Sequence, residues 1–468
     1  MKLVDIDNPV RASWFAEQGH RLDPSPYISE TFAAKRFLER IARTDLLGDI
    51  TEDIFHAGRA ARSYTTSREH GIPFLGSADI FESDLSFAPL IAKGSAYDSP
   101  RAKLQPGWTL ITCSGMNAGR VTYSRIEMSG YSCSQDVMRV VPNRSKIPAG
   151  YLYTFLASPF GIPLIRGGIY GTSVKHIEPS HIIDLPIPRV GPETERRIDV
   201  LIQEAMELRY RFQIKVADAT RDLFESAGLP ELLDICWHGQ PRDLDFSVTR
   251  LTPTSLRALN YMPRARRILD EVRAVPHRTL GDICAGGRFS RGLRFKRIDS
   301  NSKHGIKLVG QRQGFWLKPS GRWISQAEDI ADVTVPDETV LIAARGTLGE
   351  SEVYCRATFV THRWTRFAYT DDFIRIRSGM EEFPNAYLFA FLRSDAAFRM
   401  LRSTSSGSKQ QDINEELRRQ IPVPECNRAD RERIAETVRS AYRLREEADL
   451  KEDQALALLD QAVREAAG

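Results

Sequence analysis

The chain has 468 residues, which is too long for one small domain and suits two to four domains. Its hydrophobic content of 42%, charged content of 27% and net charge of +4 are ordinary for a soluble globular protein, so composition neither demands nor excludes a nucleic-acid partner. The six cysteines contain no CxxC pair, which argues against a zinc site or a disulfide framework and favours a reducing cytoplasm.

The first predicted elements occur twice in the same order. From Arg21 the sequence predicts an extended lead-in, an amphipathic helix and a turn into a strand that includes Leu-Gly-Asp-Ile at residues 47–50. The same features begin again at Arg257 and include Leu-Gly-Asp-Ile at residues 280–283. The order of elements therefore indicates two related halves.

A strand-rich region follows in each half. Residues 106–121 and 336–351 both contain a turn with proline, a short run of β-forming residues and a loop with two glycines. Further on, residues 151–156 and 387–392 each predict a short helix that is buried on one side. We therefore expect each globular part to mix α and β structure, with many short strands.

The clearest internal repeat covers residues 171–209 and 407–445, which align without a gap. Each copy has a loop of small and polar residues, then a segment closed by two prolines, then a long charged helix. Proline fixes φ and lacks a backbone donor, so no helix can run through these segments. An internal repeat of this length predicts two structural copies.

Both long helices carry apolar residues at steps of three and four, which is typical of a coiled-coil-like seam, although any amphipathic helix shows such a stripe. Alanine at several of these positions predicts a close approach of the two helices. About 35 helical residues span about 50 Å, enough to separate two domains. The predicted seam residues are Ile198, Leu201, Ala205, Leu208 and Phe212 in the first helix, and Ile434, Val438, Ala441 and Leu444 in the second.

The predicted fold class is α+β. Two tandem strand-rich domains are each followed by a long helix, and the two helices pair as an antiparallel coiled coil. Gly228 and Pro230 are expected to end the first helix. The predicted segments are a first domain at 1–190, a first helix with connector at 191–245, a second domain at 246–424 and a second helix at 425–468.

This arrangement resembles the DNA specificity subunit of type I restriction–modification systems. The residues that carry the resemblance are Gly-Ser-Lys-Gln-Gln-Asp-Ile at 407–413, Ile-Pro-Val-Pro at 421–424 and the helix that follows. Support comes from the two Leu-Gly-Asp-Ile segments and from residues 341–349. The first half departs from the family pattern, with Gly-Thr-Ser-Val-Lys-His-Ile at residues 171–177.

The resemblance implies a function and a set of partners. In that family the globular parts are target-recognition domains, each of which reads one half of a bipartite site in double-stranded DNA. The helices set the spacing and bind two adenine methyltransferase subunits, which bring S-adenosylmethionine, so no cofactor is expected in this chain. Whether a motor-nuclease subunit joins stays open. A cytoplasmic role in bacterial or archaeal phage defence is implied.

Candidate DNA contacts follow from the chemistry of the duplex. Backbone amides, hydroxyls and lysines suit phosphates, arginine can donate two hydrogen bonds to guanine, and asparagine or glutamine can pair with adenine. For any one of these residues the alternative is a solvated surface position, and for a single arginine this alternative is favoured. The candidates are Asn117, Arg120, Arg166, Thr172, Ser173, Lys175 and His176 in the first half, and Arg288, Arg312, Arg345, Arg402, Ser405, Ser408, Lys409, Gln410 and Gln411 in the second.

Several catalytic signatures are absent from the sequence. There is no GxxxxGK[ST] phosphate loop. A DNA adenine methyltransferase needs a glycine-rich cofactor loop and an Asn/Asp-Pro-Pro-Tyr tetrapeptide, and in residues 23–27 the two prolines are not adjacent. No histidine has metal-ligand spacing to a neighbouring Cys or Asp, so no metal is expected. No apolar run approaches the roughly 20 residues of a membrane span, so no membrane partner is expected.

These absences predict a non-catalytic subunit and leave two alternatives. One is a structural scaffold or protein-interaction subunit that reads no DNA, an interpretation supported by the modest net charge of +4. The other is a self-contained nuclease or methylase, which would need a catalytic constellation that the sequence lacks. Arginine and lysine gathered on one face would favour DNA reading, and dispersed charge would favour the scaffold.

Overall fold

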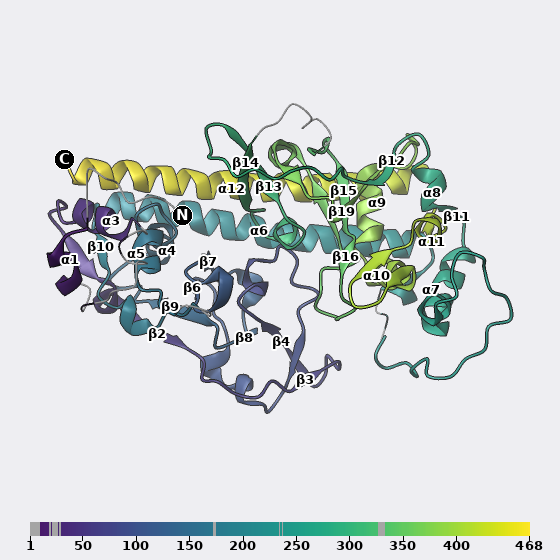
Figure 1. The fold of residues 1–468 in the computed structure, drawn as a ribbon, viewed down its shortest axis with the longest axis horizontal. Coiled ribbons are helices and arrows are strands. Elements are labelled where there is room, and N and C mark those ends of the chain that lie inside the picture. Colours follow the sequence, from purple (N-terminus) through teal and green to yellow (C-terminus); the bar gives the residue numbers. More distant parts are fainter. Residues whose placement is uncertain are drawn as a thin grey trace. The chain divides into compact units, whose positions relative to one another are not determined.

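The chain is described here from a computed structural model that places residues 10–17, 20, 27, 30–171, 175–233, 235, 237–325 and 333–468. It divides into two compact units (Figure 1). Unit 1 comprises Met1–Phe81, Ala88–Tyr210 and Glu447–Gly468, and unit 2 comprises Glu82–Phe87 and Arg211–Glu446. The predicted domains followed sequence order, whereas each compact unit takes a part of both long helices.

Unit 1 contains two four-stranded sheets. The central sheet is antiparallel, and in the smaller sheet the pair β4–β8 is parallel. All four residues of the inner strand β6 are buried, as expected for a strand covered on both faces. The central order is β2 (Thr51–His56), β9 (Val137–Pro142), β6 (Thr109–Thr112), β7 (Val121–Tyr123), and the smaller order is β3 (Tyr64–Thr65), β5 (Leu90–Ala92), β4 (Gly71–Leu75), β8 (Ser132–Cys133).

Unit 2 repeats this topology. Its central sheet is again antiparallel, and the last of its four strands in sequence again lies between the first and the second. Its smaller sheet again contains one parallel pair, β13–β18. The predicted strand-rich region is therefore confirmed in both halves. The central order is β12 (Arg288–Arg291), β19 (Phe373–Arg377), β15 (Thr339–Ala343), β17 (Ala357–Val360), and the smaller order is β14 (Gly321–Ser325), β13 (Gly305–Val309), β18 (Ala368–Tyr369).

The proline segments form strands. In unit 1, β10 (Pro186–Pro188) pairs with β1 (Thr44–Leu46), and in unit 2, β22 (Pro422–Pro424) pairs with β11 (His277–Thr279). Two-stranded pairs have only edge strands, where proline is tolerated because its missing donor faces away from the partner. The prolines thus end one element and start the next, as predicted.

The repeated Leu-Gly-Asp-Ile segment follows β1 and β11 directly. The amide of Leu47 donates to the carbonyl of Leu185 at 2.9 Å, and the amide of Leu280 donates to the carbonyl of Ile421 at 2.8 Å. A Cβ atom on the glycine of the second copy, Gly281, would lie 2.9 Å from the carbonyl oxygen of Arg419. Glycine is therefore required here by the close approach of the neighbouring backbone.

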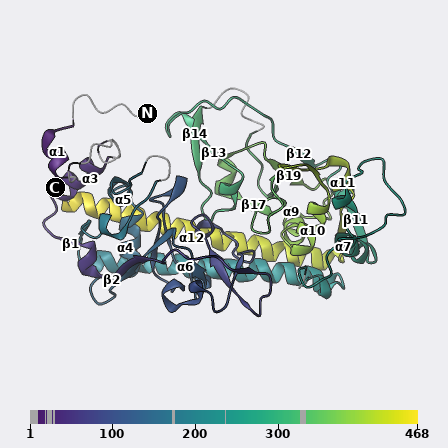
Figure 2. The same ribbon diagram turned by 60° about the horizontal axis from the view of Figure 1, so that its bottom comes forward.

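The short helices α4 (Ala149–Leu156) and α9 (Asn385–Leu392) correct one expectation. They were predicted to be buried on one side, yet all of α4 and all of α9 except Asn385 are buried. In unit 1 the reason is that α4 packs on β6 and β7 of the central sheet and also contacts the long helix α6 (Figure 2), where the amide of Gly150 donates to Asp199 at 2.6 Å. A helix covered on two faces is apolar all round.

The remaining described helices are short. They are α1 (Ala12–Glu17), α3 (Thr31–Leu38), α5 (Gly161–Gly167), α7 (Pro263–Arg273), α8 (Leu280–Ile283), α10 (Asp395–Ser403) and α11 (Glu415–Arg419).

One buried arginine joins the two sheets in each unit. Arg139 on β9 donates to the carbonyl of Cys133 on β8 at 2.6 Å, and Arg375 on β19 donates to the carbonyl of Tyr369 on β18 at 3.3 Å. Both side chains are fully buried. Burying a guanidinium is costly unless its donors are satisfied, so these bonds to carbonyls fix how the two sheets of a unit meet.

The long helices α6 (Pro192–Ser226) and α12 (Arg428–Ala466) contact each other inside each unit. In unit 2, the rings of Phe212 and Tyr442 lie 5.2 Å apart, and Asp222 pairs with Arg433 at 2.7 Å, so the two segments run in opposite directions. In unit 1, residues of α6 and α12 share one core. Of the predicted seam residues, Leu201 and Leu444 are partly buried, and those that are buried are Ile198, Ala205, Leu208, Phe212, Ile434, Val438 and Ala441.

An ionic network is buried between the helix segments of unit 1. Arg209 on α6 donates to Asp449 at 3.0 Å and to Glu452 at 2.5 Å on α12, and the hydroxyl of Tyr153 donates to Glu452. Burial alone would lower the pKa of Arg209, but the adjacent carboxylates of Glu452 and Asp449 raise it.

Among the described residues, no helix is long and apolar enough to cross a membrane.

The repeat aligns Arg209 with Arg445, and the two arginines bind different partners. In unit 2, Arg445 is also buried, but it donates to the backbone carbonyls of Trp316 at 3.0 Å and Leu317 at 2.9 Å. The same position on the helix therefore serves helix–helix pairing in unit 1 and packing of a loop on the helix in unit 2.

Candidate nucleic-acid interface

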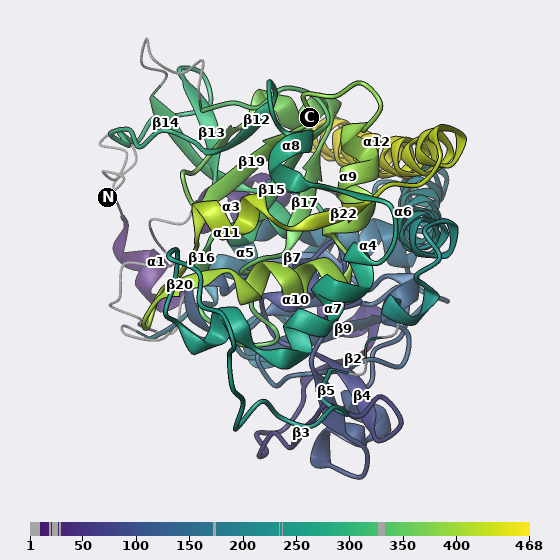
Figure 3. The same cartoon turned by 90° about the vertical axis from the view of Figure 1, so that its right-hand side faces the viewer.

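The predicted polar loop is a β-hairpin in unit 2. Strand β20 (Ser405–Gly407) pairs with β21 (Gln411–Ile413), which also pairs with β16 (Arg345–Gly346), the continuation of the loop after β15 (Figure 3). Gly407 has φ +89°, and a Cβ there would lie 2.6 Å from the carbonyl oxygen of Gln410. Glycine permits both the left-handed turn and this close approach.

Unit 1 builds the same frame with isolated bridges. Ser114 pairs with His176, and His176 pairs with Tyr170, in the positions that β16, β21 and β20 occupy in unit 2. Gly171 has φ +93° at the position of Gly407. In both units, therefore, the loop after the inner strand is held against a pair of antiparallel segments, and the first of these segments is followed by, or ends at, a glycine with positive φ.

Five of the candidate residues in the first half lie close to this frame. The amide of Gly115, which opens the short turn that contains Asn117, donates to the carbonyl of Lys175 at 3.1 Å. The next turn has Gly119 at φ +79°, where a Cβ would lie 3.2 Å from Cγ of Arg166. The five residues brought together are Asn117, Arg120, Arg166, Lys175 and His176. Thr172 and Ser173 lie outside the described residues.

Positive charge is concentrated in this unit 1 cluster. Burial lowers the pKa of Arg120, and the positive charge of Arg166 lowers it further. Lys175 is exposed, and the side chain of Met116 at the tip of the neighbouring turn is 96% exposed. Two like charges held this close favour an anion between or above them.

Beneath the loop, each unit holds an aspartate at the same position. In unit 1 the backbone carbonyl of Asp136 accepts from the amide of Cys113 at 2.7 Å, and its side chain accepts from Ser114 at 2.7 Å and Arg62 at 3.1 Å. In unit 2 the carbonyl of Asp372 accepts from the amide of Ala344 at 2.8 Å. Its side chain accepts from an arginine, Arg345, at 3.1 Å.

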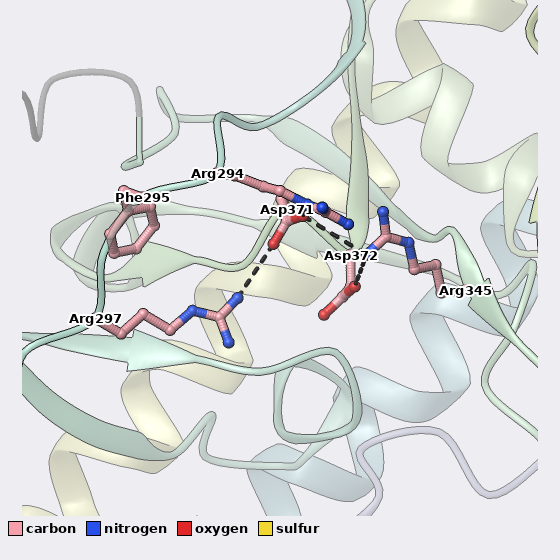
Figure 4. A pocket seen from close by; sticks show the side chains of 6 residues that line it. All are labelled: Arg294, Phe295, Arg297, Arg345, Asp371 and Asp372. Atoms are coloured by element: carbon pink, nitrogen blue, oxygen red, sulfur yellow. Dashed lines mark hydrogen bonds and ion pairs between the residues drawn. The ribbon is translucent and has the colours of Figure 1, made fainter.

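A polar cleft opens beside this aspartate in unit 2. It has a volume of about 330 Å³ and is lined by Arg294, Phe295, Arg297, Arg345, Asp371 and Asp372 (Figure 4). We call this set of residues the arginine cleft. Nε of Arg294 donates to Asp371 at 2.9 Å, and Nη2 of Arg297 donates to the other oxygen of Asp371 at 3.1 Å.

In the arginine cleft, the negative charge of Asp371 is buried and the positive charge of Arg294 is exposed. The side chain of Asp371 is 8% exposed, whereas that of Arg294 is 75% exposed. Burial alone would raise the pKa of Asp371, but the hydrogen bond from Arg294 and the charge of Arg345 hold it below its ordinary value. The carboxylate therefore remains ionised at neutral pH and anchors arginines whose other nitrogens face solvent.

Most residues of the arginine cleft were not predicted from the sequence. Arg291 extends it toward the hairpin, because its guanidinium bonds to Asp412 on β21 and to the carbonyl of Ala344 at 3.2 Å. The signal was present in residues 288–297, where basic residues recur at short spacing. These residues are Arg288, Arg291, Arg294, Lys296 and Arg297.

Three of the second-half candidates have buried side chains that bond within the protein. Arg402 donates to the carbonyls of Leu348 at 2.6 Å and Gly349 at 2.7 Å. Ser405 accepts from the hydroxyl of Tyr354 at 2.8 Å, and the side-chain amide of Gln411 donates to the carbonyl of Ser408. These contacts support the hairpin, so we do not propose Arg402, Ser405 or Gln411 as DNA contacts.

The other second-half candidates are accessible in differing degrees. Ser408, Lys409 and Gln410 form the exposed hairpin turn. Arg345 lines the arginine cleft. Arg312 is half-buried near Glu82, at 3.7 Å, and Arg288 is half-buried on β12.

Among the residues that the structure describes, no three His, Cys, Asp or Glu side chains are grouped so that they could hold a metal ion.

The comparisons with known proteins give no match by sequence: no family model and no curated protein matches the chain. Solved structures do match over most of its length. The S subunit of a type I restriction–modification system from M. genitalium has 13% identity and a TM-score of 0.32, and covers 91% of this chain and 95% of its own.

Two further solved chains are similar. The HsdS subunit from Thermoanaerobacter tengcongensis has 14% identity and a TM-score of 0.27, and the match covers 90% of this chain and 96% of that one. A chain from a structure of the assembly and conformational transition of the type I restriction–modification system has 13% identity and a TM-score of 0.26, and covers 90% and 97%. Such low TM-scores assign no role to individual residues.

Proposed function

We propose that this chain is the DNA specificity subunit of a type I restriction–modification system or of a related phage-defence complex. Each unit would read one half of a bipartite site in double-stranded DNA. The observation that carries the proposal is the frame repeated in both units, a loop held against a glycine-turn hairpin, with arginines gathered at it each time. Repetition of the frame fits two half-sites, and gathered arginines fit a polyanion.

In unit 1, the proposed role of the cluster is to bind the DNA backbone. Arg120 and Arg166 lie close enough for one charge to lower the pKa of the other, and Lys175 is exposed nearby. Phosphates neutralise such a group, and release of their counterions drives binding. Asn117 and His176, on the turn and the hairpin, are the proposed base readers in this half.

The long helices are the proposed spacer. Contacts between α6 and α12 inside each unit support an antiparallel coiled coil that sets the distance between half-sites. We further propose that the complex works in the cytoplasm of a bacterium or archaeon and contains two adenine methyltransferase subunits, with a motor-nuclease subunit as an optional member. S-adenosylmethionine would bind to the methyltransferase. This chain would position the methyltransferase on the DNA without taking part in catalysis.

The scaffold alternative rests on the modest net charge of +4. The structure gives a way to weigh it, because a scaffold has no need to concentrate arginine at the hairpin frame of both units. The arginine cleft and the Arg120–Arg166 cluster are such concentrations. They favour DNA reading, although the total charge is small.

Methylation mapping tests the proposal. The chain would be co-expressed with the methyltransferase encoded beside it, and modified adenines mapped across the genome by single-molecule sequencing, with and without this chain. We expect a split motif of two short half-sites that appears only when the chain is present. Methylation that is equally frequent and equally placed without the chain would overturn the proposal in favour of a scaffold.

A further inference from the structure

We infer that unit 2 recognises a G·C base pair through the arginine cleft, with Arg294 donating to the guanine edge. The inference rests on the proposed DNA-reading function and adds which base pair the cleft selects. Arg294, Arg297, Asp371 and Asp372 carry it together with Arg345, the one residue of this group that was predicted as a DNA contact.

The orientation of Arg294 supports this assignment. Its Nε is committed to Asp371 at 2.9 Å, and within the described part of the chain no hydrogen bond engages either of its Nη atoms. With a side chain that is 75% exposed, Arg294 presents these two parallel donors to solvent. In the major groove, O6 and N7 of guanine are two adjacent acceptors that match this edge of a guanidinium.

Asp371 prepares the arginines for this role. One buried carboxylate holds Arg294 and Arg297 by its two oxygens, so the rotamers of both long side chains are restricted before DNA arrives. Restricting them beforehand lowers the entropic cost of binding. Planar, two-pronged donation is a property of arginine that a lysine ammonium lacks.

The carboxylates also decide between a base and a phosphate as ligand. A phosphate placed in the cleft would approach both Asp371 and Asp372, and like charges at short range repel. The edge of a G·C pair has no such charge, and it carries an amino donor on cytosine N4 that a carboxylate can accept. Asp372, with a side chain that is 31% exposed, is accessible for this second contact.

At the matched position, the described residues of unit 1 do not form a carboxylate that holds two arginines. Ser114 replaces Arg345 in the frame, and Asp136, at the position of Asp372, binds Ser114 and Arg62. The preceding residue, at the position of Asp371, is the uncharged Gln135. The two halves of the site are therefore expected to differ in composition. We expect the guanine that Arg294 selects to lie in the half-site that unit 2 reads.

The test uses the full chain in complex with its methyltransferase and a pool of randomised DNA duplexes. Bound duplexes are sequenced for the wild-type complex, R294K and R294Q. As a matched control, R266Q removes another exposed arginine of unit 2, one that is 60% exposed and pairs with Asp270 at 3.6 Å on helix α7. We expect one guanine position in one half-site to be enriched by wild type and R266Q, to be only weakly enriched by R294K, and to become degenerate in R294Q.

Competition between the selected duplex and one with A·T at that position gives the size of the effect. A two-bond arginine–guanine contact predicts about 10- to 100-fold discrimination by wild type. R294K keeps the charge but loses the planar donor pair, so discrimination should fall to a few-fold. Its dependence on salt should stay close to that of wild type, because the number of neutralised phosphates is unchanged.

Each result has a distinct meaning. If R294K keeps the guanine preference, or if R294Q reduces only the salt dependence and binds all sequences more weakly, Arg294 contacts a phosphate and the inference is wrong, while the proposed function stands. If the wild-type complex enriches no duplex at all, the proposed function fails and the inference fails with it.

Discussion

The hairpin frames of the two units hold their arginines in opposite ways. In unit 1, Arg120 faces the like charge of Arg166, and burial and this charge together lower the pKa of Arg120. In unit 2, Arg294 and Arg297 face the buried carboxylate of Asp371. The comparison teaches that one backbone frame can carry a backbone-binding cluster in one copy and a base-selecting cleft in the other, because only the side chains at a few matched positions differ.

The long helices show the same principle at Arg209 and Arg445. The repeat aligns the two residues, and both are buried. Arg209 binds two carboxylates of the other helix, whereas Arg445 binds two backbone carbonyls of a loop. The difference between charged and neutral partners predicts different costs when each arginine is removed.

Substitution of these two arginines should have the largest effect. R209M leaves Asp449 and Glu452 buried without their cation and should cost about 3–5 kcal/mol. R445M leaves neutral carbonyl acceptors and should cost about 1–3 kcal/mol. Urea unfolding of the full chain measures both. As a control, E204Q breaks the exposed Lys451–Glu204 pair and should change the free energy of unfolding least of the three variants. Equal costs for R209M and E204Q would contradict the assigned network.

The next largest effect is expected from the double variant R120Q/R166Q in unit 1. Two cations at phosphates contribute about 0.9 each to the salt slope, so the slope of log affinity against log salt should fall by about 2. Affinity should fall for all sequences alike. Fluorescence anisotropy over a range of salt concentrations measures both quantities. K93Q, an exposed lysine bonded to the carbonyl of Glu69, is the control and should leave the slope unchanged.

A smaller effect is expected from D371N in unit 2. The substitution keeps the shape of the side chain but removes the charge that anchors Arg294 and Arg297, so both arginines gain freedom. Discrimination between G·C and A·T should fall several-fold, while affinity for unrelated DNA should rise because a negative charge is lost. Competition binding with matched duplexes measures both. Unchanged discrimination would show that the carboxylate does not position the arginines.

The smallest effect is on how stability depends on pH. It distinguishes Glu178 and Asn414, the residues that cap the short helix after the hairpin in unit 1 and unit 2. The repeat aligns Glu178 with Asn414, which caps α11 by accepting from the amide of Leu417 at 3.0 Å. In unit 1, a hydrogen bond from His56 lowers the pKa of Glu178, an effect that burial partly offsets. A lowered pKa contributes stability above the ordinary value of 4.5, and this stability is lost as pH falls through the folded pKa.

The variant E178Q tests this pH dependence. Its melting temperature should lie below that of wild type at neutral pH, and the difference should shrink as pH falls below 4.5. N414Q, which alters the uncharged cap of unit 2, should show a difference that does not depend on pH. Thermal unfolding followed at several pH values measures this, and a pH-independent difference for E178Q would contradict the role of its charge.

Much of the fold could be predicted because it depends on patterns that survive in sequence. The proline segments, the Leu-Gly-Asp-Ile turns and the apolar seam all act through backbone geometry or burial, and each recurs in both halves. The burial of α4 on all sides was not predicted, because its apolar residues fit one-sided and two-sided burial equally well until its neighbours are known.

The candidate site was predicted less completely. The loop residues Asn117, Arg120 and Lys175 were identified because they lie in glycine-containing loops at recurring positions. The arginine cleft was missed because Arg294 and Asp371 are far apart in sequence and meet only when β12 and β19 pair. Conversely, Arg402 has the same chemistry as a base reader, and only its burial shows that it holds a loop.

The central claim is that each unit reads its own half of the DNA site. The most direct measurement is the genome-wide map of methylated adenines for complexes that carry N117A/H176A, which removes the proposed base readers of unit 1, or R294K. We predict that each variant changes the methylated motif in one half-site only, that the two variants affect opposite halves, and that the spacing between the halves is kept. Relaxation of the same half by both variants, or an unchanged motif for both, would contradict the claim.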